Sequence, residues 1–109
     1  MARYMAIIDV TAAAFKGLIQ SPQDRKEATT TLFSSIGGEV EHYWFGIGSN
    51  TLYIVINAPE NDVNMEALSM LVFGSGIAQS MNMVKLMCSD EAVAAMKKAG
   101  ELAYDAPSN

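Results

Sequence analysis

Apolar and polar residues alternate with a period of two along four segments of the chain, as they do in strands whose two faces meet different surroundings. The four segments are residues 2–10, 39–46, 51–57 and 78–88. In the first segment, one face carries only tyrosine and aliphatic residues, namely Tyr4, Ala6, Ile8 and Val10. We expect that face to pack against a core layer, because charged residues occur on the opposite face, at Arg3 and Asp9.

Two helices are predicted between these strands, and residues 11–19 are expected to form a short helical turn. The first helix is expected to have Ser21 at its N-cap and to stop at Gly37-Gly38. Its expected buried stripe is Ala28, Leu32, Phe33 and Ile36. The second helix is expected to open near Asn61. Its expected buried stripe is Val63, Ala67, Met70 and Leu71.

The order of elements predicts the fold class. A last helix is expected from Asp90 to Ala99, capped by Ser89 and stopped by Gly100, with a tail of about residues 101–109 that frays. The order is then β-α-β-β-α-β plus a C-terminal helix, which is the ferredoxin-like, split βαβ arrangement. We therefore expect a single α+β domain over residues 1–109, with a four-stranded antiparallel sheet, helices on one face and the other face bare.

The bare face of this sheet is expected to be rich in methionine if Val84 and Leu86 face the helices. Its apolar residues would then be Met5, Ile7, Tyr53, Val55, Met81, Met83 and Met87. A monomer would expose them as one large apolar patch, so we expect a second copy to cover them in a homodimer or a higher homo-oligomer. Two alternatives are that the C-terminal helix folds back over the face, and that the methionines line a cavity for an apolar ligand.

Composition and charge narrow the classes of function. Half of the residues are apolar and 17% are charged, which excludes an intrinsically disordered chain. The formal net charge is −5, and the seven lysines and arginines are scattered rather than gathered with aromatic residues. We therefore expect neither nucleic acid nor a membrane among the partners.

Cys88 is the single cysteine, so no internal disulfide can form, and we expect it to be a buried thiol. The N-terminus has one base and a short apolar run broken by Asp9, which matches a signal peptide poorly. These features favour a cytoplasmic protein. No second histidine or cysteine lies at metal-ligand spacing, so we expect no metal site and no cofactor.

His42 is the single histidine, and we expect it to share its side of the strand with Val40 and Trp44. It is a candidate general acid or base, although a lone histidine on a strand is more often a structural hydrogen-bonding group. Lys85 interrupts the methionine face and is expected either to pair with Asp9 or Glu41 or to hold an anionic ligand. The candidate ligand-binding residues are Met5, Trp44, Tyr53, Met81, Met83 and Lys85.

Several short motifs are spread along most of the chain. They are Ser21-Pro22-x-Asp24-Arg25, Gly37-Gly38, Tyr43-Trp44, Gly48 and Asn57-Ala58-Pro59-Glu60. Together, over about residues 2–97, they resemble the GYD domain family, which implies a ferredoxin-like fold that pairs as a dimeric α/β barrel. At the motif that names the family, Gly48 holds the glycine position, but Asn50 and Thr51 stand where the family has tyrosine and aspartate.

Three functions are compatible with these observations. The first is a small oligomeric protein that binds a small, partly apolar ligand in a cavity between sheet and helices or at the dimer interface. The second is a cofactor-free enzyme in which His42 is the acid or base and Tyr53 and Lys85 orient the substrate. The third is a protein-interaction module whose partner covers the methionine face.

Overall fold

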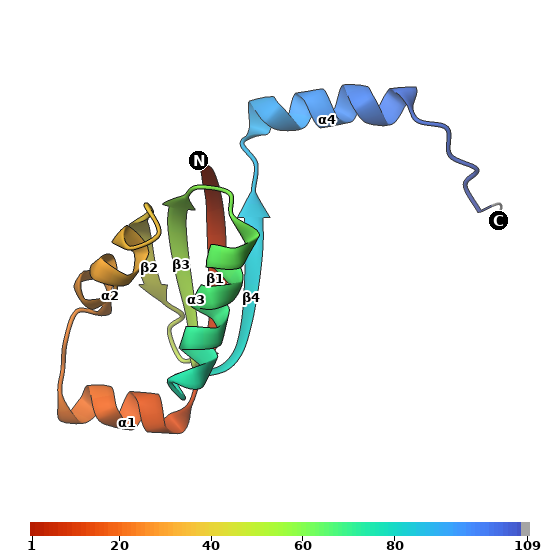
Figure 1. Ribbon diagram of the computed structural model, residues 1–109. Coiled ribbons are helices and arrows are strands. Elements are labelled where there is room, and N and C mark those ends of the chain that lie inside the picture. The colour runs from red at the N-terminus through yellow and green to blue at the C-terminus, as the bar shows by residue number, and fades with distance from the viewer. Residues whose placement is uncertain (108–109) are drawn as a thin grey trace.

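The computed structural model of the chain describes residues 1–107 (Figure 1). Its elements are β1 (Ala2–Val10), α1 (Ala12–Gln20), α2 (Arg25–Ser34), β2 (Glu39–Phe45), β3 (Thr51–Ala58), α3 (Asp62–Gly74), β4 (Ala78–Leu86) and α4 (Ser89–Glu101). The strands form one sheet in the order β2-β3-β1-β4, and all neighbouring pairs are antiparallel. The predicted α+β class and ferredoxin-like sheet are confirmed.

The core lies between α2, α3 and one face of the sheet, which we call the inner face. The predicted inward face of β1 is confirmed, because Tyr4, Ala6, Ile8 and Val10 are all buried. β3 adds the buried residues Leu52, Ile54, Ile56 and Ala58. Phe33 of α2 and Leu68 of α3 pack onto this layer, and Ile56 has no exposed surface at all. The alternation in the sequence therefore correctly identified the strands that carry the core.

The two faces of β4 are the reverse of the prediction. Met81 and Met83 lie across from buried residues of β1, so they belong to the inner face and pack against the core. Val84 lies across from Met5 on the opposite face, which we call the outer face. The apolar residues of the outer face are Met5, Ile7, Trp44, Tyr53, Val55, Val84 and Leu86. Because both sides of β4 carry apolar as well as polar residues, the alternation alone could not choose between them, and the pairing with β1 decides.

A β-bulge in β2 also changes which residues share a face. The register with β3 shifts between Val40 and His42, so Glu41 is an extra residue in the strand. Val40 and Tyr43 therefore pack toward the core, whereas His42 and Trp44 lie on the outer face. The prediction that Val40 shares a side with His42 is wrong, because the inserted residue interrupts the alternation.

The first predicted helix begins later than expected. Asp24, and not Ser21, is the N-cap of α2, and its Oδ1 accepts a hydrogen bond from the Lys26 N–H at 2.9 Å. Ser21 instead ends α1, which is a full helix rather than a single turn. Pro22 explains the division, because the residue before a proline is disfavoured in the helical conformation.

The buried sides of the helices also differ from the spacing predicted. In α3, Leu68 is buried and Met65 and Val72 pack partly against the core. The residues predicted for that stripe are all exposed, namely Val63, Ala67, Met70 and Leu71. Ala28 of α2 is exposed as well. α3 has apolar residues on several sides, so its position against the sheet, and not the spacing alone, selects the buried side.

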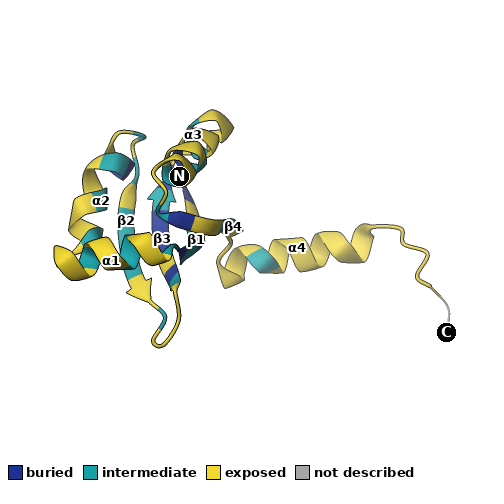
Figure 2. Cartoon of the chain, turned by 90° about the horizontal axis from the view of Figure 1, so that it is seen from below, coloured by how far each residue is buried: buried dark blue, intermediate teal, exposed yellow. Residues whose placement is uncertain are grey.

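α4 extends away from the sheet, and nearly all of its residues are exposed (Figure 2). The radius of gyration is 17.5 Å, whereas a compact domain of this length would have about 13 Å. The alternative in which the C-terminal helix covers the bare face is therefore wrong for the described residues. Cys88 is the N-cap of α4, Ser89 is already helical, and Gly100 lies within the helix rather than ending it.

The predicted frayed tail is partly described. Its first residue, Glu101, is still helical, and residues 103–107 have no regular secondary structure. Residues 108–109 lie outside the described part of the chain.

Candidate functional site

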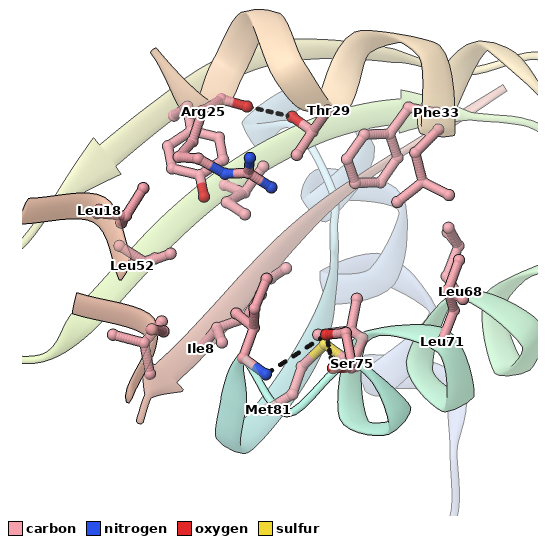
Figure 3. Close-up of a pocket in the computed structure, with 18 of the residues that line it drawn as sticks. Ile8, Leu18, Arg25, Thr29, Phe33, Leu52, Leu68, Leu71, Ser75 and Met81 are labelled. Carbon is pink, nitrogen blue, oxygen red and sulfur yellow. Dashed lines mark hydrogen bonds between the residues drawn. The ribbon is translucent and has the colours of Figure 1, made fainter. Parts of the chain in front are cut away.

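A cavity of about 470 Å³ lies between the inner face of the sheet and the helices α1, α2 and α3 (Figure 3). Its wall is mostly apolar and includes Ile8, Leu18, Phe33, Leu52, Leu68, Leu71, Met81 and Met83. Its volume falls within the range of sites that bind small molecules in proteins. This cavity, which we call the inner cavity, is the strongest candidate for a functional site.

Apart from Ser75 at the C-cap of α3, the polar groups of the inner cavity lie near the start of α2. Arg25 is the one charged residue lining it among those described, and its Nη1 donates a hydrogen bond to Oε1 of Gln23 at 2.7 Å. The Thr29 hydroxyl donates to the Arg25 carbonyl at 2.9 Å (Figure 3). Tyr43 also lines the cavity, and burial raises the pKa of its phenol, with the nearby Arg25 opposing that change. The cavity therefore combines an apolar wall with one cationic corner.

The predicted ligand-binding residues are divided between the two faces of the sheet. Met81 and Met83 line the inner cavity. Met5, Trp44 and Tyr53 lie on the outer face, where Trp44 is directly across from Tyr53 on the neighbouring strand. The structure therefore brings two methionines to the cavity and leaves the aromatic pair on the other side of the sheet.

His42 lies on the outer face, where its ring stacks on that of Trp44. The two ring centroids are 4.5 Å apart, and the ring planes differ by 16°. His42 is exposed and is not among the residues that line either cavity in the described part of the chain. The sheet separates it from the inner cavity, so His42 is not placed to transfer a proton to a molecule held there.

Lys85 borders a second cavity, of about 700 Å³, beside the start of β1 and the end of β4. Its Nζ lies 3.0 Å from Oε2 of Glu60, and both side chains are more than half exposed. The expected partners are occupied elsewhere, since Glu41 pairs with Arg3 at 2.6 Å and Asp9 accepts hydrogen bonds from hydroxyl groups. The predicted pairing of Lys85 is wrong, because β4 turns this side chain to the face opposite Asp9.

Cys88 is exposed, and not buried as predicted, because it caps the projecting helix α4. Its Sγ donates a hydrogen bond to Oε1 of Glu91 at 2.7 Å. The carboxylates of Asp90 and Glu91 raise the pKa of this thiol. The neutral thiol is thereby favoured, which makes Cys88 a weak nucleophile.

Asn50 and Thr51 tie the end of the β2–β3 hairpin to β1. Asn50 donates a side-chain hydrogen bond to the Val10 carbonyl at 3.0 Å. The Thr51 hydroxyl donates to one carboxylate oxygen of Asp9 at 2.7 Å, and the Ser80 hydroxyl donates to the other at 2.8 Å. These two hydrogen bonds lower the pKa of Asp9. Thr51 therefore stabilises a negative charge on its neighbour, which an aspartate at this position would repel.

We expect Thr51→Val to raise the pKa of Asp9 toward its ordinary value, because the variant keeps the side-chain shape and removes one donor. A carboxyl group with a lowered pKa stabilises the fold above its unfolded-state pKa, and this contribution disappears as pH falls through the folded-state pKa. The variant should therefore be less stable than the wild type at neutral pH, and the difference should shrink below about pH 4. NMR titration of the Asp9 carboxyl carbon measures the pKa, and urea unfolding at both pH values measures the stability.

Thr31→Val is the matched control for this substitution, because Thr31 lies exposed on α2. Its replacement should leave the titration of Asp9 unchanged. An unchanged pKa of Asp9 in Thr51→Val would contradict the role assigned to the hydroxyl.

Within residues 1–107, no group of three or more His, Cys, Asp and Glu side chains is arranged to hold a metal ion. None of the helices in the same range has both the length and the apolar character needed to cross a bilayer.

Arg25 and Leu18 were not identified as site residues from the sequence alone. Leu18 belongs to a segment expected to form only a turn. Arg25 has a recognisable signal, since it begins the helix stripe that faces the sheet. That stripe, at the spacing i, i+4, i+7 and i+8, is Arg25, Thr29, Leu32 and Phe33. A cation at the head of an inward-facing stripe is the pattern that could have identified the polar corner of the cavity.

Comparison with known families supports the extent of the resemblance seen in the sequence. A family model described as GYD domain matches residues 4–96. No curated protein and no solved structure matches the chain. All residues that line the inner cavity fall within the matched segment.

Proposed function

The chain belongs to the GYD domain family, and from this premise we propose that it is a binding protein for a small, largely apolar molecule held in the inner cavity. The observation that carries the proposal is the cavity itself, with its volume of about 470 Å³ and its mostly apolar wall. Its residues all lie in the segment matched by the family model. The proposed binding site therefore lies within the family domain.

The α1 helix supports this proposal because it borders the cavity with small residues. Ala14 and Gly17 line the cavity together with Leu18, and no residue of α1 is fully buried. Larger side chains at the first two positions would occupy part of the volume. A helix that borders a space with small side chains leaves room for a ligand, and the ligand can make the van der Waals contacts that larger side chains would otherwise make.

The second part of the proposal is a homodimer in which the outer faces of two copies pack against each other, as in a dimeric α/β barrel. It is supported by apolar side chains that a single chain leaves accessible. Trp44 is 52% exposed, Tyr53 and Val84 are each 37% exposed, and Leu86 is 36% exposed. Contiguous apolar surface of this kind is typical of interaction sites.

Binding in the inner cavity can be tested with N-phenyl-1-naphthylamine, a neutral dye whose fluorescence increases in apolar surroundings. We expect Ala14→Phe to weaken dye binding by about tenfold or more, corresponding to at least about 1.4 kcal/mol, because the added ring occupies the cavity. Ala13→Phe is the matched control, since Ala13 is exposed on the same helix and does not line the cavity. It should bind the dye as the wild type does.

Methyl NMR spectra identify where the dye binds. The methyl groups of Met81 and Met83 should shift on titration, because both residues line the inner cavity. Met5 lies on the outer face and serves as the reference. Unchanged affinity in Ala14→Phe, or shifts at Met5 without shifts at Met81 and Met83, would contradict the proposed site.

A further inference from the structure

The wall of the inner cavity holds a positive charge that no described residue neutralises. Arg25 lines the cavity, and none of the other described lining residues is acidic. Its side chain is half-buried, and the ion pairs found in the described part of the chain all involve other residues. The chain has a net charge of −5, so a general excess of bases does not explain a lone cation here. A charge beside an apolar cavity is costly unless an opposite charge accompanies it.

The Arg25 guanidinium also has hydrogen-bond donors that the protein does not use. A guanidinium carries five N–H groups. Arg25 donates from Nη1 to Gln23 and also interacts with the Tyr43 hydroxyl, so not all five groups have a partner among the described residues. Figure 3 shows the guanidinium directed from α2 toward the interior of the cavity. Tyr43 is close enough to Arg25 for each to affect the other. A tyrosine hydroxyl is protonated at neutral pH at its ordinary pKa, and burial raises the pKa of this one further. Two kinds of donor therefore meet at one corner of an apolar space.

We infer that the ligand of the inner cavity is a small apolar monocarboxylate, with its carboxylate on Arg25 and its apolar part against the sheet and helices. This inference rests on the proposed binding function and adds the chemical class of the ligand. A planar carboxylate matches the fork of a guanidinium and accepts two parallel hydrogen bonds from it. One cation balances one negative charge, which favours a monocarboxylate over a phosphate monoester carrying nearly two negative charges at neutral pH. The apolar residues Leu18, Leu52 and Met81 are available for the rest of the molecule.

Decanoate and decan-1-ol form a suitable pair of probes, because they share an alkyl chain and differ in the charge of the head group. We expect the wild type at pH 7 to bind decanoate about 10- to 100-fold more tightly than decan-1-ol, as measured by displacement of the naphthylamine dye. Arg25→Gln should remove this preference and leave the affinity for decan-1-ol unchanged. Lys26→Gln is the matched control, because it removes the neighbouring positive charge from a residue that does not line the cavity. It should keep the preference for decanoate.

Three outcomes distinguish this inference from the proposed function. If Arg25→Gln keeps the preference for decanoate, the inference is overturned and the binding function stands. The same conclusion follows if the wild type binds decan-1-ol and the dye but does not bind decanoate. If the dye, decan-1-ol and decanoate all fail to bind the wild type, the binding function fails together with the inference. Tyr43→Phe provides a second test if Arg25→Gln folds poorly. It keeps the buried ring, and it should lower decanoate affinity several-fold with no change for decan-1-ol, whereas equal affinity for decanoate would count against the inference.

Discussion

Ile56→Ala is expected to lower the free energy of unfolding by about 2–5 kcal/mol, because it removes buried methyl and methylene groups and leaves a space in the core. Ile56 has no exposed surface and lies on β3, across from Tyr4 on one side and Val40 on the other. A domain of this size typically has only about 5–15 kcal/mol of stability, so the substitution removes a large part of it. Urea unfolding followed by far-ultraviolet circular dichroism measures the change.

Ile47→Ala is the matched control for the core substitution. Ile47 is fully exposed in the turn between β2 and β3, so the same change of side chain should alter stability by no more than about 0.5 kcal/mol. Equal effects at Ile56 and Ile47 would show that the inner face of the sheet is not the stabilising core. Both variants should be compared at the same protein concentration, because the proposed association with a second copy would also contribute to stability.

Val84→Lys is expected to weaken the proposed homodimer by about 100-fold or more. Val84 lies on the outer face across from Met5, and a two-fold symmetric interface would contain the new lysine twice. Burying a charge without a partner costs several kcal/mol, and each 1.4 kcal/mol changes an association constant tenfold. Sedimentation velocity over a range of micromolar concentrations should show a dimer for the wild type and a particle of 11.7 kDa mass for the variant.

Val63→Lys separates the effect of the outer face from that of added charge. Val63 is 77% exposed on α3, on the helical side of the sheet, and its replacement should leave the dimer intact. Circular dichroism should give the wild-type spectrum for both variants, because neither residue belongs to the core. A monomeric wild type, or equal dissociation in the two variants, would overturn the proposed pairing of outer faces.

The sequence predicted the strands well because their evidence is local. In β1, alternation over nine residues separates one buried face from one less buried face, and the structure keeps that division throughout. The hairpin of β2 and β3 was also predicted, since turn residues at Gly48 and Asn50 separate two short alternating runs. Gly48 has a φ of +77°, a backbone conformation that glycine adopts with little strain.

Most of the errors share a cause, which is that they concerned contacts between residues far apart in the chain. Met81 and Met83 could have faced either side, until pairing with β1 placed them inside. The helix boundary near Ser21 is the exception, because its causes are local. The helix expected after Ser21 begins only at Arg25, and the turn expected before Ser21 is a full helix, because Pro22 and the cap at Asp24 outweighed the first suitable N-cap residue. In each case the residue types permitted two local structures, and the assembled sheet or the neighbouring turn selected one.

The candidate site was less predictable than the fold. Methionines were expected to contact an apolar ligand, and Met81 and Met83 do line a cavity. That cavity lies between sheet and helices, which was one of the two expected places, but the methionines had been assigned to the opposite face of the sheet. Trp44 and His42 are residue types that often bind ligands or transfer protons, yet both lie on the outer face, away from the inner cavity. Arg25 is the residue on which the proposed ligand class depends, and it borders a cavity whose walls come from several separate segments of the chain.

By itself, the sequence determined the four strands, their order among the helices and the single-domain α+β class. These follow from alternation, caps and turns, which involve residues within one or two turns of each other. Only the tertiary structure decided which face of β4 is buried and that α4 leaves the outer face uncovered. It also decided that the bulge in β2 directs Tyr43 toward the core. It also placed Arg25 beside a cavity formed by three helices and the sheet. The physical reason is that burial depends on which distant segments meet, and several arrangements satisfy the same local pattern of apolar and polar residues.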